Sequence, residues 1–497
     1  MMGDRAKKPG PAWPRTAALP VVVLALAGFV YGLYGFDGPL YRDYGIYLYG
    51  GQRVAEGVPP YVGIFDHKGP LPFVLAGAGV ALSGVFGLAD VYGARLVFYA
   101  VGCLAAVAVY ALGERAFRSR AAGLFGALTF LGFYGFARPV ASGPDAKVPI
   151  VLFQALSLLL MIQKRWFWAG LSGSLSFLAW QPMGILPLVA VILALSQPRT
   201  ERRDAALRAL AGASTPLAAT VAYYWYHGAL RELLDGLVLF NLVRVNRGGP
   251  PPALAPAGPI GEVLEWYGTM VGPLVLGLAV VASLYFSRSL WRRHAPLLLT
   301  LPVFAAWSLL DFQTPEDLYA FLPYAAVGFG ALLASVVRHA GRPRVVGALL
   351  GAALLALALV NTPLVGAREV QRPSLQAQQR SAEEIRERLG PDAEIVSINA
   401  PQVLALMGEE NPDPYLFTTE GIDRQIAADV PGGFGGWIDD LRARDPDAIA
   451  FFAEAQRQQP TSGMGPENAR LLNDWLDSRY RVEKIGTFYL YVKDPSP

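Results

Sequence analysis

The sequence predicts a polytopic α-helical membrane protein that carries a small α/β domain at its C-terminal end. Of its 497 residues, 53% are hydrophobic and only 16% are charged, and its mean hydropathy is +0.35. Mostly apolar segments recur between Leu19 and Val360, each of about 17 to 25 residues and long enough to cross a bilayer. From Arg368 onward the composition becomes that of a soluble domain. These three observations outweigh the two to four domains that length alone suggests.

About eleven segments are long and apolar enough to be transmembrane helices. An uncleaved first helix is expected, because no small-x-small cleavage site is evident before Tyr31. A further apolar stretch, 70–88, is ambiguous. The predicted spans are 17–35, 93–112, 121–138, 149–163, 166–181, 182–197, 206–227, 267–286, 295–310, 318–337 and 345–362.

The positive-inside rule decides the topology. If the N-terminus is cytoplasmic and 70–88 does not cross, every short arginine-rich connection falls on the cytoplasmic side. We therefore expect 70–88 to be a re-entrant or surface-lying helix and the C-terminal domain to be extracytoplasmic. The protein is accordingly predicted to be a multi-pass protein of the cell membrane. The connections carry Arg115, Arg118, Arg120, Lys164, Arg165, Arg199, Arg202, Arg203, Arg208, Arg288, Arg292, Arg293, Arg338, Arg342 and Arg344.

The composition also restricts the partners. A net charge of +3, with no basic block that contains interleaved aromatics, argues against a nucleic-acid partner. The lipid bilayer is the expected one. Cys103 is the single cysteine, so no disulfide can form within the chain.

The predicted external loop 36–92 is rich in groups that a membrane core disfavours. Asp43 follows the first span, and a carboxylate at the membrane surface can act as a general base on an acceptor hydroxyl. A merely solvated interfacial aspartate explains Asp43 equally well on its own. Further along, a lysine suits a phosphate and a histidine can exchange a proton, although a charged turn beside a helix is the alternative. This second group is Asp66, His67 and Lys68, with Tyr47 and Tyr61 as sugar-contacting candidates.

Three other external segments supply candidates. In the turn 139–149, Asp145 lies near Arg138 and Lys147, where it could bind a metal–phosphate or position a sugar, or be an ordinary polar turn. Arg95, at the outer start of a span, needs a partner because arginine is costly in hydrocarbon, and 311–319 ends in Tyr319. The stretch 229–266 predicts an interfacial helix followed by a proline-rich connector, with Asn241, Arg244 and Arg247 as alternative lipid-phosphate ligands.

These motifs occur in a recognisable order. A first span is followed by R-D-Y-x-x-Y at 42–47, E-G-x-P-P-Y at 56–61, D-H-K-G-P at 66–70, an apolar helix and G-A-R-L at 93–96. The order resembles that of the polyprenyl-phosphate-dependent membrane glycosyltransferases of the GT-C superfamily. The nearest branch contains the protein O-mannosyltransferase-like, aminoarabinose transferase-like and Rgt-type enzymes. The resemblance covers about 17–340 and is strongest over 36–96.

The resemblance implies a GT-C fold and an inverting transfer of sugar from a polyprenyl-phosphate donor to an acceptor hydroxyl on a glycan, lipid or protein. It implies Asp43 as the catalytic carboxylate, Lys68 and Pro70 near the donor phosphate, and Asp145 as the acidic residue of the second external loop. Many relatives carry Asp-Glu where this chain has Asp43-Tyr44. A metal site within the first loop is therefore in doubt. If a divalent metal ion is a cofactor, Asp43 and Asp145 are its expected ligands.

The soluble part, 368–497, is predicted to alternate helices and strands. Ser381 and Glu384 fit a capping box for a helix that stops at Gly390, and 431–436 is expected to be a glycine-rich loop. The expected order after that helix is strand 393–399, helix 438–445, strand 448–452, helix 467–479 and a hairpin over 480–493.

Two other functions fit a chain of this kind. A multi-pass transporter or lipid flippase without glycosyl transfer activity would place charges at the membrane midplane, usually on repeated halves. Here the charged motifs lie at one predicted surface and no internal repeat is visible. A non-catalytic membrane scaffold with a soluble binding domain is the third interpretation.

Overall fold

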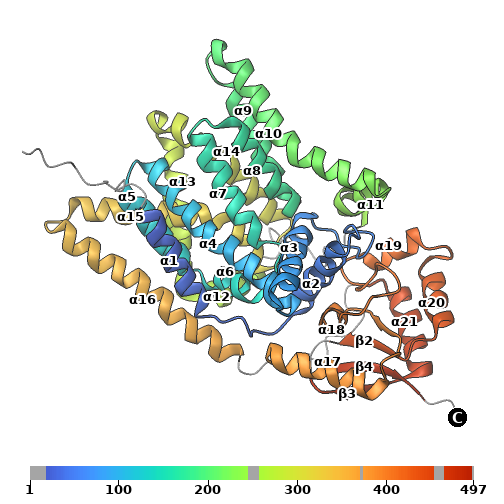
Figure 1. Cartoon of the computed structure of the whole chain (residues 1–497). Helices are drawn as coiled ribbons and strands as arrows, with labels where there is room; N and C mark the ends of the chain where they lie inside the picture. Colours follow the sequence, from blue (N-terminus) through green and yellow to red (C-terminus); the bar gives the residue numbers. More distant parts are fainter. Residues whose placement is uncertain (1–17, 245–256, 370–372, 453–463, 495–497) are drawn as a thin grey trace, which may run out of the picture.

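The structure is a computed structural model, and it describes residues 18–244, 257–369, 373–452 and 464–494. The described residues up to Glu369 form mainly a bundle of helices. Those from 373 onward form an α/β domain that lies against one end of that bundle (Figure 1). The bundle consists of α1 (Ala18–Gly32), α4 (Asp90–Phe117), α5 (Arg120–Leu131), α6 (Tyr134–Ser142), α7 (Val148–Ile162), α8 (Trp166–Ala179), α9 (Ile185–Leu195), α10 (Arg199–Tyr226), α12 (Ala257–Tyr267), α13 (Val271–Ser283), α14 (Arg288–Leu310), α15 (Leu322–His339) and α16 (Pro343–Glu369).

The predicted membrane fold is confirmed, since each predicted span coincides with helix. In the described parts of the chain, five helical segments are long and apolar enough to cross a membrane by themselves. Four shorter apolar helices accompany them, at Ala18–Gly32, Leu71–Phe86, Val148–Ile162 and Gln181–Leu195. The five longer segments are Asp90–Phe117, Gly258–Phe286, Ser289–Leu310, Pro315–His339 and Pro343–Asn361.

The predicted span over 121–138 is helical but not continuous. The chain bends by 67° between α5 and α6. Helix α5 ends at Gly132, and Pro139 lies inside α6, where its missing N–H and its ring disfavour a regular helix. The bend turns α6 towards the loop that contains Asp145.

Between α1 and α4 lie two helices, α2 (Arg42–Ala55) and α3 (Leu71–Phe86). Most of α2 is buried, from Tyr44 to Arg53, and α3 coincides with the stretch 70–88 that was predicted to be a re-entrant or surface-lying helix. A Cβ atom at Gly50 would lie 2.3 Å from the Phe73 ring, so α2 and α3 approach each other more closely than side chains would normally allow. The two helices therefore hold the intervening segment, 56–70, in a defined position.

Several short helical segments complete the bundle around the segment 56–70. The chain after α10 forms α11 (Leu230–Leu234) and then a wide π-helical segment, η2 (Asp235–Arg244). The 3-10 helices are η1 (Gln181–Gly184), η3 (Gly268–Met270), η4 (Leu284–Phe286) and η5 (Pro315–Phe321). The predicted helix after 229 is thus present in a looser form. Arg247 and the core of the proline-rich connector lie outside the described residues.

The C-terminal domain is built on a four-stranded sheet in the order β1-β2-β4-β3. β1 pairs parallel with β2, and the predicted hairpin, β3 with β4, is confirmed as an antiparallel pair. The strands are β1 (Ile395–Ser397), β2 (Ala448–Phe452), β3 (Tyr480–Ile485) and β4 (Phe488–Lys493), and the helices are α17 (Leu375–Leu389), α18 (Pro401–Met407), α19 (Ile422–Asp429), α20 (Gly433–Arg444) and α21 (Pro466–Arg479).

Two local predictions in this domain were wrong. Ser381 does not cap α17: the helix begins about two turns earlier, where the Ser374 side chain accepts a hydrogen bond from the Ala377 N–H. The Ser381 hydroxyl instead interacts with Thr487 at 3.0 Å. The glycine-rich segment 431–436 is not wholly a loop, because α20 begins at Gly433. The predicted stop at Gly390 is confirmed.

The C-terminal domain packs directly on α2. A Cβ atom at Gly45 would lie 2.6 Å from the backbone nitrogen of Gln402 in α18. Leu40 and Gln378 exchange hydrogen bonds at 2.7 and 3.1 Å. Buried apolar side chains of the loop and of the domain form one continuous core. The first loop is thereby held between the helix bundle and the C-terminal domain.

Candidate active site

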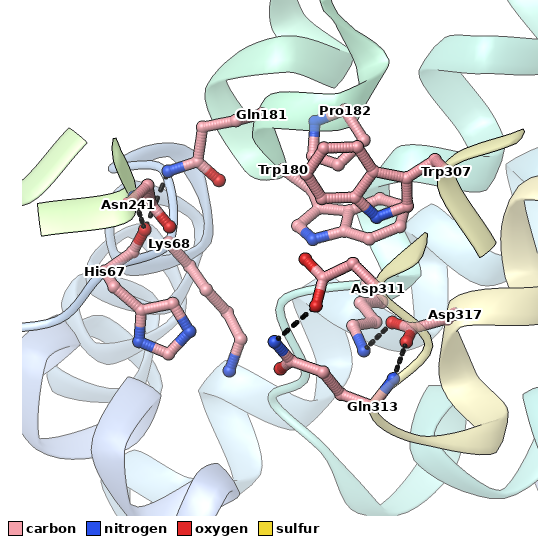
Figure 2. A pocket seen from close by; sticks show the side chains of 11 residues that line it. His67, Lys68, Trp180, Gln181, Pro182, Asn241, Trp307, Asp311, Gln313 and Asp317 are labelled. Atoms are coloured by element: carbon pink, nitrogen blue, oxygen red, sulfur yellow. Dashed lines mark hydrogen bonds and ion pairs between the residues drawn. The ribbon is translucent and has the colours of Figure 1, made fainter. Parts of the chain in front are cut away.

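A polar cavity opens between the first loop and the bundle. Figure 2 shows His67 and Lys68 on one wall, facing Trp180, Trp307 and the segment 311–317. The complete lining is His67, Lys68, Lys147, Trp180, Gln181, Pro182, Asn241, Trp307, Asp311, Gln313 and Asp317. Segments far apart in the sequence therefore meet at this cavity.

Lys68 extends into the cavity towards Gln313 (Figure 2). Its ammonium nitrogen lies 5.7 Å from the centroid of the Tyr47 ring. No carboxylate of the described residues forms an ion pair with it. Burial alone would lower the pKa of Lys68, but Tyr47, Asp66 and Asp43 more than offset this effect and raise it. Lys68 is therefore a charged group that faces the cavity.

The backbone next to Lys68 is clamped from two directions. The side-chain amides of Gln181 and Asn241 each donate a hydrogen bond to the carbonyl oxygen of His67, both at 2.7 Å. The Tyr61 hydroxyl donates to the carbonyl of Lys68 at 2.6 Å. Two consecutive carbonyls are thus fixed by donors from α10–η2, η1 and the loop itself, which orients the Lys68 side chain.

The tyrosines and Asp66 form the base of the loop. Asp66 is buried and accepts hydrogen bonds from the Tyr47 hydroxyl at 3.1 Å and from the backbone N–H of His67 at 2.7 Å. Tyr61 has a positive φ of 67° and stacks on Tyr224 at 5.9 Å. Tyr47 and Tyr61, predicted as sugar-contacting residues, support the loop and do not line the cavity.

Asp43 lies in the first turn of α2, beside Arg42. The Arg42 guanidinium contacts only one carboxylate oxygen of Asp43, Oδ1, at 3.0 Å. Burial raises the pKa of Asp43, but Arg42, Lys68 and Lys147 together outweigh burial and hold it below its usual value. Asp43 is not among the residues that line the cavity, but it lies within electrostatic range of both cavity lysines.

Arg42 also connects Asp43 to the C-terminal domain. It pairs with Glu420 at 3.2 Å and donates a hydrogen bond to the Thr419 hydroxyl at 3.0 Å. The second oxygen of Glu420 lies 3.6 Å from Nε2 of His67. Burial raises the pKa of Glu420, but His67, Lys68 and Arg42 lower it overall. Glu420 and Asp43 thus both face Arg42 and Lys68.

The second loop contributes Asp145 and Lys147. Lys147 forms an ion pair with Asp317 at 2.6 Å and donates to the Thr314 hydroxyl at 3.1 Å. The Asp145 carboxylate accepts a hydrogen bond from the Lys147 backbone N–H at 2.7 Å. Burial, followed by the nearby Glu316, raises the pKa of Asp145 to about 6. Lys68 and Lys147 act on Asp145 as well as on Asp43, so both predicted carboxylates lie within electrostatic range of the same two lysines.

Three predicted substrate-contacting residues instead face protein groups. Arg95 is fully buried and donates to the carbonyls of Phe36, Gly38 and Gly143. Arg138 donates to the Tyr41 hydroxyl, and the Tyr319 hydroxyl donates to the carbonyl of Gly135 at 2.6 Å. The structure therefore places Arg95 as a brace between the first and second loops, and none of these three side chains lines the cavity.

The sequence offered only weak signals for several residues of this site. Trp180, Gln181 and Trp307 lie in apolar runs that were interpreted as spans. Glu420 stands in a soluble domain, 378 positions from Arg42. Asp317 belongs to the predicted external segment 311–319. Only the structure shows that the Asp317 carboxylate forms an ion pair with Lys147.

The expected metal ligands do not form a metal site by themselves. Among the described residues, no three His, Cys, Asp or Glu side chains gather closely enough to hold a metal ion. Oδ1 of Asp43 is engaged by Arg42, and Oδ1 of Asp145 by a backbone N–H. A divalent metal ion held by Asp43 and Asp145 stays a prediction, and the catalytic step proposed for this site does not depend on one.

Comparison with known sequences gave no match, either to a protein-family model or to a curated protein. Comparison with solved structures did. ArnT from Cupriavidus metallidurans superposes with a TM-score of 0.61 in its apo state and 0.59 when bound to undecaprenyl phosphate. The identities are 14% and 15%, and the matches cover 97% and 98% of this chain and 100% of ArnT.

A second similar structure is archaeal oligosaccharyltransferase AglB from Archaeoglobus fulgidus, in complex with an inhibitory peptide and a dolichol-phosphate. It has a TM-score of 0.53 and 14% identity over 97% of this chain and 75% of AglB. Both neighbours are GT-C glycosyltransferases. The chain has the GT-C fold. At these identities the likeness extends to the fold alone, and the C-terminal part of the chain is included in it.

Proposed function

We propose that this GT-C protein is an inverting glycosyltransferase that moves a sugar from a polyprenyl-phosphate donor to an acceptor hydroxyl. The observation that carries the proposal is Lys68, which extends into the cavity without a carboxylate partner among the described residues, within electrostatic range of Asp43. The solved structures with undecaprenyl phosphate and dolichol-phosphate support a donor of this lipid class.

Lys68 is proposed to bind the donor phosphate. Lys68 lies three residues before Leu71, the first residue of α3, and is separated from it by Gly69 and Pro70. The N-terminal end of a helix favours an anion because its first N–H groups have no partners within the helix. A lipid phosphate leaves as an anion, so the departing group needs electrostatic stabilisation more than a proton. Lys68 and the start of α3 can supply it.

Asp43 is proposed as the general base. Its lowered pKa keeps the carboxylate ionised at neutral pH, which is the form that accepts a proton. Arg42 occupies Oδ1 and leaves Oδ2 for the acceptor hydroxyl. As that oxygen attacks the anomeric carbon from the face opposite the phosphate, its proton passes to Asp43. Inverting hydrolases use one carboxyl group as acid and another as base. Here the base alone suffices, because the phosphate leaves as an anion and needs no proton.

The proposal includes the topology. Residues 1–367 form the multi-pass domain in the cell membrane, with a cytoplasmic N-terminus and the loop 36–92 outside. Residues 368–497 form the extracytoplasmic domain. The arginine-rich connections support this orientation, and so does the packing of the C-terminal domain on α2, which places both on one side. The acceptor class (glycan, lipid or protein) and the sugar stay open.

A transfer assay tests the proposal. The purified protein, reconstituted in lipid nanodiscs, is incubated with a panel of radiolabelled polyprenyl-phosphate hexoses and pentoses and with lipid, glycan and peptide acceptors. We expect one donor to yield a product of inverted anomeric configuration. Absence of transfer with every donor, together with movement of a labelled polyprenyl phosphate between leaflets of protein-containing vesicles, would favour the flippase alternative.

A further inference from the structure

The C-terminal domain places the Glu420 carboxylate between Arg42 of α2 and His67 of the first loop. We propose that Glu420 is a positioning residue of the candidate active site, so that the C-terminal domain completes the site that the first loop begins. This inference rests on the proposed function. It adds a role for a residue that lies outside the first loop and outside the helix bundle.

The first observation is the way Arg42 is shared. Its Nη2 lies 3.0 Å from Oδ1 of Asp43 and 3.2 Å from Oε1 of Glu420, so one nitrogen is shared between two carboxylates. The Thr419 hydroxyl accepts a third hydrogen bond at 3.0 Å, and the Phe417 ring centroid lies 5.9 Å from Cζ. Three neighbouring residues of one turn thus hold the guanidinium that Asp43 depends on.

The second observation is the other oxygen of Glu420. Oε2 lies 3.6 Å from Nε2 of His67, while Oε1 pairs with Arg42. His67 stacks on Phe240 at 5.6 Å, and its carbonyl is the one clamped by Gln181 and Asn241. A single carboxylate therefore connects the start of α2 with the segment that carries Lys68.

The turn is held in a constrained conformation. Glu420 has a φ of 63°, in the left-handed region that non-glycine residues adopt only at a cost. Two residues before Glu420, Thr418 is fixed by two hydrogen bonds with Asn399. The Thr418 N–H donates to the Asn399 side-chain oxygen at 2.9 Å, and the Asn399 amide donates to the Thr418 hydroxyl at 3.2 Å. Strained backbone conformations are frequently found at functional sites. Here the strained conformation of Glu420 directs its side chain towards Arg42.

The role of Glu420 follows from the geometry at Asp43. Among the described residues, Arg42 contacts only Oδ1 of Asp43, and Oδ2 has no hydrogen-bond donor. Without an opposing carboxylate, a guanidinium beside an aspartate tends to pair with both of its oxygens. Glu420 draws Arg42 away from that arrangement. It thereby keeps one oxygen of Asp43 available for the acceptor proton.

The test compares Glu420→Gln with a matched control, Glu409→Gln. Glu409 pairs with Arg386 at the same N–O distance, 3.2 Å, within the C-terminal domain and away from the cavity. We expect Glu420→Gln to lower kcat for transfer by about ten-fold, the typical value of one charged hydrogen bond. The donor KM should not rise, because removing a negative charge near Lys68 does not weaken its attraction for phosphate. Glu409→Gln should behave like the wild type.

A double variant separates positioning from loss of structure. If Glu420 acts through Arg42, then Arg42→Gln combined with Glu420→Gln should be no slower than Arg42→Gln alone, since coupled residues are not additive. Glu420→Asp should restore part of kcat. Equal kcat in Glu420→Gln and Glu409→Gln, or a lowered melting temperature with a raised KM, would overturn the inference while the wild-type enzyme stays active. An inactive wild type would instead count against the proposed function.

Discussion

The first and second loops each bring one carboxylate and one lysine to the same region, but in opposite electrostatic states. In the first loop, Asp43 has a lowered pKa and Lys68 has no carboxylate partner among the described residues. In the second loop, the pKa of Asp145 is raised to about 6 and Lys147 is neutralised by Asp317 at 2.6 Å. The same two residue types therefore have different capabilities.

The difference assigns the chemistry to the first loop. An ionised carboxylate with one open oxygen can accept a proton, and an unpaired ammonium can bind a phosphate. In the second loop, Lys147 already forms an ion pair with Asp317, and that pair anchors η5 to the start of α7. We therefore expect substitutions in the first loop to change catalysis, and those in the second loop to change stability.

The largest expected effect is that of Asp43→Asn. The amide cannot accept the acceptor proton, so transfer should fall by about 10³-fold, within the usual range for loss of a general base. Asp145→Asn is the matched control and should fall by less than about ten-fold, because it removes no proposed proton acceptor. Rates are measured with saturating donor in nanodiscs. If Asp145→Asn were the more damaging change, the roles of the two loops would be reversed.

The next effect is on stability. Asp317→Asn leaves the buried Lys147 ammonium without its counter-charge, and breaking a buried pair on one side typically costs about 3 kcal/mol or more. Denaturation in detergent micelles measures this loss. A second variant, Lys147→Met with Asp317→Asn, should recover part of the lost stability, since no unpaired charge remains. No difference between the single and double variants would mean that the pair does not anchor η5.

Lys68→Ala should have a smaller effect, and it should appear in binding. Loss of one charged contact to phosphate is expected to raise the donor KM by about ten- to a hundred-fold. Lys68→Arg retains the charge and should keep most of the affinity. An unchanged KM for Lys68→Ala would remove Lys68 from the phosphate site.

The comparison also shows what the sequence could predict. Helices α2 and α3, the hairpin β3–β4 and the exposed motifs around Asp43 and Lys68 follow from local patterns, such as apolar periodicity and the spacing of prolines and glycines. The bend of 67° between α5 and α6 was missed. Its apolar residues satisfy the hydropathy of a span whether or not the backbone continues straight.

The ion pairs between residues far apart in the chain could not be predicted from the sequence, for a different reason. Arg42 and Glu420 are 378 positions apart, and Lys147 and Asp317 are 170 apart. Nothing local distinguishes these charges from solvated ones, because pairing depends on how α18 packs on α2 and how η5 meets α7. For the same reason Arg95 was predicted to contact substrate, whereas the structure directs it to three backbone carbonyls.

The smallest expected effect concerns pH. Asp145 has a folded pKa of about 6 against an ordinary value of 3.8, so between these values the folded protein binds more protons than the unfolded chain. Stability should therefore fall as pH rises from about 4 to about 6, by about 1 to 3 kcal/mol. Asp145→Asn should remove this slope, whereas Asp43→Asn should not, because the lowered pKa of Asp43 affects stability only below pH 4 or so. Melting temperatures of both variants across this range make the test. An unaltered slope in Asp145→Asn would show that the second-loop carboxyl is already ionised near pH 4, and the contrast between the two loops would then rest on their lysines alone.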